Sequence, residues 1–274
     1  MIIIYTILFG LIQGLTEFLP ISSTGHLAIF HNIWSLDIAS DLGFDVVLHG
    51  GTLFALLVYF WDDLVKYMSG FFRSLRCWNF SNDLEQRMSW LVIMGTIPAA
   101  VIGYLIENYI EDSLRTLWVI VVALFVGAIV FIISEKHARK VKELSDIKIG
   151  WAIVIGLAQA IALIPGVSRS GSTIITGLLF NLKREAAAKF AFLLSIPIVL
   201  GAGVKKTAEL VEIGAFTQNW LIYVVGFVSS FVSGYLCIKY FLRYLKSNSL
   251  NPFAYYRIIL SLVLATLIIF GVLS

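Results

Sequence analysis

The sequence carries little charge. Charged residues make up 14% of its 274 residues, whereas a soluble domain carries about 25%. Hydrophobic residues make up 59% of the chain, and the mean hydropathy is +0.91. Apolar runs of about 20 residues recur along it, which is the length that a helix needs to cross a bilayer. The composition excludes a soluble domain and predicts an all-α membrane protein with several spans.

Other absences narrow the function. The alternating strands of a membrane barrel are missing. The two cysteines, Cys77 and Cys237, are far apart and lack a metal-binding spacing, so we expect both to be apolar fillers. The net charge of +3 comes from loop lysines and arginines and predicts no nucleic-acid partner. The N-terminal segment lacks the basic region and cleavage pattern of a signal peptide, so we expect it to belong to the mature fold.

Two short polar stretches interrupt the apolar chain. Residues 13–26 read QGLTEFLPISSTGH, and residues 159–173 read QAIALIPGVSRSGST. Each follows an apolar run of helical character, breaks at a proline and continues as a cluster of serine, threonine and glycine. Polar groups at membrane depth are costly and usually mark function. The similarity of the two stretches predicts that they form two halves of one site.

Apolar segments of two lengths predict the architecture. Six are long enough to cross a bilayer, with 189–204 the shortest: 44–61, 88–106, 116–134, 189–204, 219–238 and 253–273. Four more flank the polar stretches: 2–19, 25–34, 150–164 and 171–182. Three of these are about 10–15 residues, too short to cross about 30 Å of hydrocarbon at about 1.5 Å per residue. We therefore predict six transmembrane helices and two re-entrant helical hairpins with polar tips.

The loop charges predict the orientation. If the N-terminus lies outside, the outer loops contain only Arg115, Lys205 and Lys206 as basic residues, and the inner loops contain many. This distribution agrees with the positive-inside rule and places both termini outside. The two hairpins then enter from opposite sides, so residues 1–134 and 150–273 are predicted to be inverted-topology repeats within a single domain covering the whole chain. Such repeats place a binding site near the membrane midplane.

The hairpin tips are suited to bind an anion. Each outgoing helix begins with capping residues and glycines, and the N-terminus of a helix attracts negative charge. Arg169 adds a planar guanidinium that matches phosphate oxygens. We expect the following tip residues to bind phosphate: Ser22, Thr24, Gly25, Ser168, Arg169, Ser170, Gly171, Ser172 and Thr173.

Gln13 and Glu17 lie four residues apart on one face of the incoming helix. A carboxylate at the negative end of a helix is reasonable if it binds a cation or acts as a base. We expect both residues to bind Mg²⁺ or Ca²⁺, which would bridge to substrate phosphates. Together with Ser23, His26 and Arg169, Glu17 supplies the groups that phosphoryl transfer needs. The attacking group stays open between Ser23 activated by His26 or Glu17, water activated by Glu17, and His26 itself.

The two stretches resemble the signature motifs of the undecaprenyl-diphosphate phosphatase, or bacitracin-resistance protein, family. The similarity extends over essentially the whole chain and includes FDVVLHGGTLFALLVYF at residues 44–60. It implies hydrolysis of a polyprenyl diphosphate to the monophosphate and inorganic phosphate, which recycles the lipid carrier for cell-wall synthesis. It also implies a divalent cation and an active site that opens to the outer face of the plasma membrane. Gln13 stands where many members have Glu, and the His49-Gly50-Gly51 step also departs from the expected pattern.

A second class of function fits the same architecture. Inverted repeats with broken helices are also found in secondary transporters, so a transporter or flippase of a lipid phosphate or another anion is the alternative. Either function implies contact with membrane lipids. The oligomeric state stays open, and a homodimer is one of the alternatives.

Overall fold

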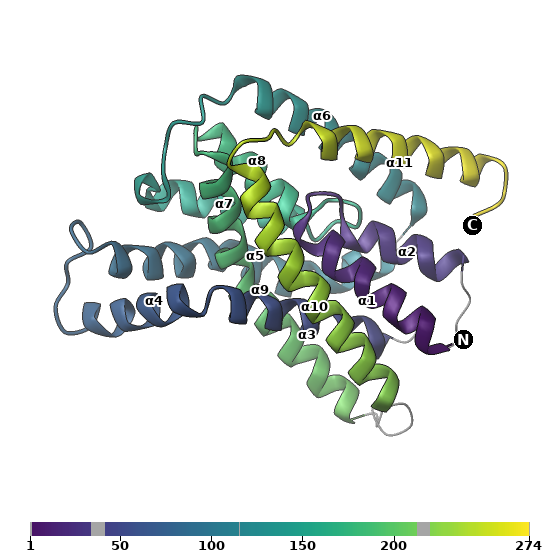
Figure 1. Cartoon of the computed structure of the whole chain (residues 1–274), viewed down its shortest axis with the longest axis horizontal. Coiled ribbons are helices and arrows are strands. Elements are labelled where there is room, and N and C mark those ends of the chain that lie inside the picture. Colours follow the sequence, from purple (N-terminus) through teal and green to yellow (C-terminus); the bar gives the residue numbers. More distant parts are fainter. Residues whose placement is uncertain (1, 34–41, 115, 213–219, 274) are drawn as a thin grey trace.

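The computed structural model describes residues 2–33, 42–114, 116–212 and 220–273. All named elements in these ranges are helical. They are α1 (Ile2–Phe18), α2 (Ser23–Ile33), α3 (Leu42–Tyr59), α4 (Trp61–Ser74), α5 (Leu84–Ser113), α6 (Leu117–His137), the 3₁₀ turn η1 (Leu144–Asp146), α7 (Ile149–Ile161), α8 (Arg169–Leu179), α9 (Arg184–Glu212), α10 (Trp220–Leu245) and α11 (Asn251–Ile269). Figure 1 shows their arrangement.

The long helices confirm a multi-pass membrane protein. Within the described ranges, five helices are long and apolar enough to cross a membrane: α5, α6, α9, α10 and α11. The number rises to six if α3 and α4, which are bent by 76° at Phe60, count as one span. The span predicted at 189–204 lies within α9, which is longer than expected at 29 residues.

Helix α4 was not anticipated, because its sequence is amphipathic rather than apolar. Val65, Met68 and Phe72 recur at helical spacing and are exposed on one face, while Asp62 and Arg73 add charge at its two ends. A helix with one apolar and one polar face favours the boundary between a membrane and water.

The two polar stretches form the turns of two helical hairpins, α1–α2 and α7–α8, so the four short apolar pieces are helices as predicted. A proline lies in each turn, where it cannot continue a helix. Each turn also contains a residue in the left-handed region, Ser22 with φ of 73° and Gly166 with φ of 89°. These reversals direct the start of each outgoing helix back toward the end of the incoming one.

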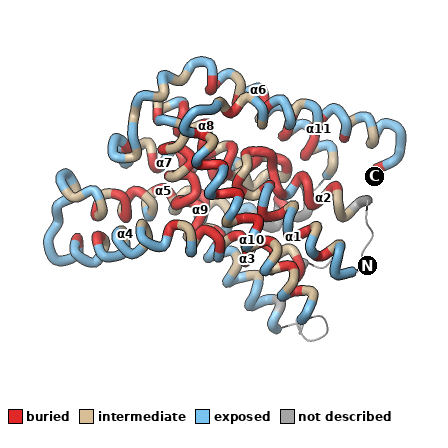
Figure 2. Tube along the Cα trace, in the orientation of Figure 1, coloured by how far each residue is buried: buried red, intermediate tan, exposed pale blue. Residues whose placement is uncertain are grey.

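Small residues allow the incoming helix of each hairpin to pack closely on a long helix. A Cβ atom added to Gly14 in α1 would lie 1.9 Å from Ser233 Oγ of α10. A Cβ added to Gly156 in α7 would lie 2.0 Å from the backbone oxygen of Gly95 in α5. Close approach through small residues is the usual way that helices pack in membranes. The turns of the two hairpins lie near the centre, where buried residues concentrate (Figure 2).

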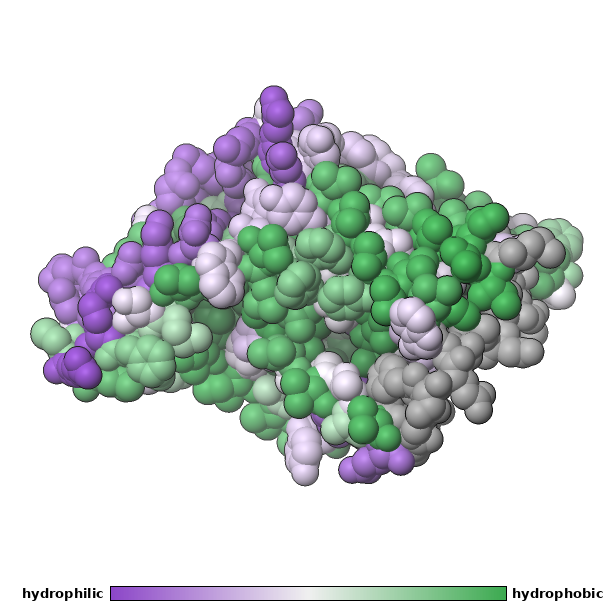
Figure 3. Space-filling model, turned by 60° about the horizontal axis from the view of Figure 1, so that its bottom comes forward, coloured by the Kyte–Doolittle hydropathy of each residue, from purple (hydrophilic) through white to green (hydrophobic). Residues whose placement is uncertain are grey.

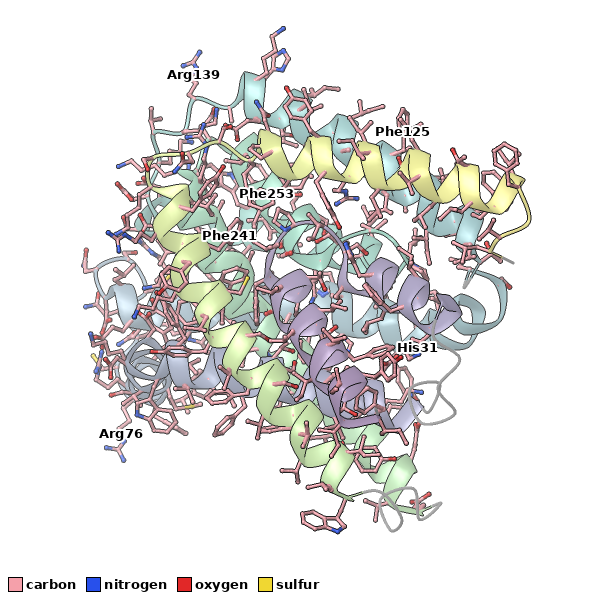
Figure 4. The ribbon with its side chains drawn as sticks, turned by 45° about the vertical axis from the view of Figure 1, so that its right-hand side comes forward. His31, Arg76, Phe125, Arg139, Phe241 and Phe253 are labelled. Carbon is pink, nitrogen blue, oxygen red and sulfur yellow. The ribbon has the colours of Figure 1, made fainter. Side chains whose placement is uncertain are left out.

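The surface separates into apolar and polar parts. A broad hydrophobic surface covers the middle of the view in Figure 3, and hydrophilic residues gather toward its left end. Arg76 and Arg139, from two basic loops, lie on the same side of the molecule (Figure 4).

Asp83 caps α5 by accepting hydrogen bonds from two backbone amides. The hydrogen bond from the Gln86 amide, together with the Arg73 guanidinium, lowers the pKa of Asp83.

Candidate active site

The tips of the two hairpins meet in the structure. The Arg169 guanidinium at the start of α8 contacts Glu17 Oε1 at the end of α1. The Gly166 amide lies 3.5 Å from Thr24 Oγ1, and Ser170 Oγ donates to the Leu19 carbonyl at 3.2 Å. The turns therefore contact each other directly, and residues distant in sequence form one site.

The Glu17 carboxylate is the centre of this site. Its side chain is only 7% exposed. Glu17 Oε2 accepts a hydrogen bond from Ser23 Oγ at 2.7 Å and another from Gln13 Nε2 at 3.1 Å. A hydroxyl that donates to a carboxylate can lose its proton as it attacks an electrophile. The arrangement therefore favours Ser23 as a nucleophile and Glu17 as its base.

A cavity of about 220 Å³ opens beside these groups. Its polar wall comes from both hairpins and from α3, and its apolar wall comes mainly from α5, the α7–α8 turn and α9. The lining residues are Glu17, Ser22, Ser23, Thr24, His49, Ala99, Gln159, Ala162, Leu163, Val167, Ser168, Arg169 and Ile198. Pockets for whole drug-sized ligands have volumes of about 300–1,000 Å³. This cavity is thus suited to a polar headgroup rather than to a whole lipid.

His26 does not lie beside Ser23. Its Nδ1 donates to the Ser22 carbonyl at 2.7 Å, and its Nε2 lies 2.7 Å from the Tyr256 hydroxyl. The rings of His26 and Tyr256 stack with centroids 5.7 Å apart. Both ring nitrogens therefore have partners, and His26 is not among the residues that line the cavity.

His49 is the histidine that lines the cavity. Its Nε2 lies 3.8 Å from Glu17 Oε2. Its Nδ1 donates to the Asp45 carbonyl at 2.9 Å, which turns Nε2 toward the site. The sequence analysis assigned His49 no role, although a polar residue within an apolar segment was a usable signal.

The other predicted phosphate ligands divide into two groups. Ser22, Thr24, Ser168 and Arg169 line the cavity. The remaining five do not, and they contact neighbouring residues or, for Ser170, the other hairpin turn: Gly25, Ser170, Gly171, Ser172 and Thr173. For example, Ser172 and Thr173 both donate to the carbonyl of Arg169.

Arg257 in α11 contacts both hairpin turns, and the sequence analysis assigned it no role. It is 1% exposed and donates to the carbonyls of Pro20 and Gly166, one from each hairpin turn. It also donates to two carbonyls of α6. Phe253 packs edge-on against Phe241 at 5.4 Å and secures the start of α11 (Figure 4). An arginine inside an apolar span was the signal, because such a charge is expensive in a membrane.

The residues predicted to bind a cation form a small donor set. Glu17 is the carboxylate, and Gln13 Oε1 is buried with no hydrogen-bond partner among the described residues. In the same part of the chain, no group of three or more His, Cys, Asp or Glu side chains could hold a metal ion. Two protein ligands are too few to hold either Mg²⁺ or Ca²⁺ alone, so substrate phosphates and water would have to supply most of the ligands of either ion.

Comparisons with known proteins show which family this chain resembles. The model of the family described as bacitracin resistance protein BacA matches residues 6–263. A protein of Rubrobacter xylanophilus named undecaprenyl-diphosphatase is 44% identical over 97% of this chain and 98% of its own length. Proteins of the same name from Methanosphaera stadtmanae and Paenarthrobacter aurescens are 38% and 40% identical, over 95% and 97% of this chain and 96% and 97% of their own lengths.

Proposed function

This chain belongs to the bacitracin resistance protein BacA family, and on that premise we propose that it hydrolyses undecaprenyl or a related polyprenyl diphosphate to the monophosphate and inorganic phosphate. The observation that carries the proposal is the meeting of Ser23, Glu17 and Arg169 at one cavity. The cavity accepts the diphosphate headgroup, and the prenyl chain lies outside it against apolar helices and membrane lipid.

The reaction proceeds in two steps. Ser23 Oγ attacks the terminal phosphorus while Glu17 takes the hydroxyl proton. The bond from that phosphorus to the bridging oxygen breaks, and its electron pair leaves with the polyprenyl monophosphate. After Glu17 has released its proton, water attacks the phosphoserine and gives a proton to Glu17, which passes it to the departing Ser23 oxygen. Inorganic phosphate is released, and the enzyme is restored.

The surrounding groups stabilise charge and remove one proton in each cycle. Arg169 binds phosphate oxygens and offsets the negative charge that builds up on them. Because Glu17 is enclosed and His49 is partly exposed beside it, His49 carries the released proton from Glu17 to water. A bound Mg²⁺ would be held by Glu17 and Gln13 with substrate oxygens, and it would offset phosphate charge.

We also propose six spans, two re-entrant hairpins and inverted repeats, with both termini and the opening of the site at the outer face of the plasma membrane. Several observations support this arrangement. Each half of the chain contains a hairpin followed by long helices. The hairpin helix α1 packs on α10 of the other half, and α7 packs on α5. The start of α1 and the end of α11 lie on the same side of the molecule (Figure 1).

Phosphate release from undecaprenyl diphosphate by the purified protein in detergent micelles tests the function. We expect catalytic release by the natural sequence and none by Ser23→Ala. A transporter would move the lipid across vesicles without releasing phosphate, and that result would contradict the proposal. The transporter alternative rests on architecture alone, which is weak support for a function.

A further inference from the structure

Gln159 is a buried polar residue with no structural partner. It lies near the end of α7, is 2% exposed and forms part of the cavity wall. Neither its Nε2 nor its Oε1 has a hydrogen-bond partner among the described residues. A buried donor and acceptor that stay unpaired destabilise the fold. Their presence at a cavity wall indicates that a ligand satisfies them.

Comparison with Gln13 explains why this amide is free. Gln13 occupies the matching place in the first polar stretch, and Glu17 follows four residues later and accepts the hydrogen bond from Gln13 Nε2. Four residues after Gln159 the chain has Leu163, whose side chain cannot accept a hydrogen bond. Leu163 also lines the cavity. In the first half, the glutamine Nε2 therefore donates to a carboxylate. In the second half, the glutamine Nε2 has no partner among the described residues.

We propose that Gln159 binds the diphosphate headgroup directly. Its Nε2 donates to a non-bridging phosphate oxygen, and its Oε1 accepts from a protonated phosphate oxygen. This inference rests on the proposed function. An amide offers both a donor and an acceptor at one place without adding charge, so it complements Arg169, which can only donate.

A buried glutamine that only stabilises the fold would lower Tm when it is replaced, whereas a glutamine that binds substrate would lower activity. Gln159→Leu removes two unpaired buried polar atoms, so the fold becomes more stable, while the contact with substrate is lost. Gln86 is a matched control because it is also buried, at 4% exposure, but both ends of its amide have partners. Its Nε2 donates to the Cys77 carbonyl at 3.1 Å, and its Oε1 accepts from the Asn79 amide at 2.9 Å.

The first experiment measures Tm and kcat/KM in detergent for Gln159→Leu and Gln86→Leu. We expect Gln159→Leu to keep or raise Tm and to lower kcat/KM by about tenfold or more, since removing one donor to a reacting group has effects of this size or larger. We expect Gln86→Leu to lower Tm and to keep kcat/KM per folded molecule within about twofold. Unchanged kcat/KM in Gln159→Leu would overturn the inference.

The second experiment measures binding without turnover. Inorganic pyrophosphate should raise the Tm of the natural protein, because a ligand that binds only the folded state stabilises it. We expect no such rise in Gln159→Leu or in Gln159→Glu, whose carboxylate repels phosphate. An equal rise in all three proteins would refute a role for Gln159 in binding. Stabilisation of the natural protein without hydrolysis of the lipid would instead contradict the proposed function and leave the binding role supported.

Discussion

The Arg169 guanidinium contacts the Glu17 carboxylate, although the two residues are 152 positions apart in the sequence. Each lies at the tip of its own hairpin, so the contact joins the two halves of the chain. Glu17 also accepts a hydrogen bond from the Ser23 hydroxyl. The proposed nucleophile and the proposed phosphate-binding cation therefore contact the same carboxylate, which is the proposed base.

The two histidines of the site are expected to respond differently to mutation. His49→Gln removes the group that takes a proton from Glu17, so we expect kcat to fall by about tenfold or more and the pH dependence of kcat to change. Among the described residues that line the cavity with His49, the charged ones are Glu17 from α1 and Arg169 from α8, while α5 and α9 contribute the uncharged Ala99 and Ile198. A pH–rate profile in detergent measures the effect.

His137→Gln is the matched control for this experiment. His137 donates from Nδ1 to a carbonyl four residues earlier, as His49 does, but it lies at the exposed end of α6. We expect its profile to match that of the natural protein. His26→Gln should lower Tm together with activity, because the His26 ring bonds to the Ser22 carbonyl and the Tyr256 hydroxyl. An unaltered pH profile in His49→Gln would exclude it as the proton relay.

Arg257→Met should separate the two hairpin turns. The change removes hydrogen bonds to Pro20 and Gly166, and the freed carbonyls stay buried. Hydrogen bonds from charged groups contribute about 1.5–3 kcal/mol each. We therefore expect the free energy of unfolding to fall by about 3–6 kcal/mol and kcat to fall with it. Thermal denaturation with the phosphate assay tests this, and a stable, fully active variant would show that Arg257 does not position the turns.

Close approach of α7 to α5 should make Gly156 intolerant of a side chain. Gly156→Ala places a Cβ 2.0 Å from the Gly95 oxygen, so the helices must separate. We expect a loss of stability of about 1–3 kcal/mol, as is usual for overpacking. Gly150→Ala on the same helix meets nothing within 4 Å and should be neutral or stabilising. Equal Tm values for the two variants would contradict the packing described for α7.

Much of this arrangement could be predicted from sequence because it depends on local patterns. The length of apolar runs indicated the spans, and the similarity of the two polar stretches indicated two hairpins with a shared site. The place of His49 at the cavity could not be predicted, because it depends on how α3 packs beside the end of α1, far from it in the sequence. Arg257 was missed because its partners are backbone carbonyls of distant segments, which no side-chain motif reveals.

Mg²⁺ should be required for full activity. The protein supplies one carboxylate and an unpaired amide oxygen, so a cation depends on substrate oxygens for most of its ligands. We expect a chelator to reduce phosphate release by about tenfold or more, and added Mg²⁺ to restore it. Gln13→Leu should raise the Mg²⁺ concentration needed for half-maximal activity. Full activity in excess chelator would remove the cation from the scheme.

A double-mutant cycle on Glu17 and Arg169 tests the central claim most directly. Phosphate release from undecaprenyl diphosphate is measured for Glu17→Gln, Arg169→Ala and the double variant, with folding checked by Tm. Because the two residues act as one unit, we expect each single change to reduce the rate by about 100-fold or more and the double change to reduce it little further. A folded single variant with the natural rate, or losses that multiply in the double variant, would contradict a shared site.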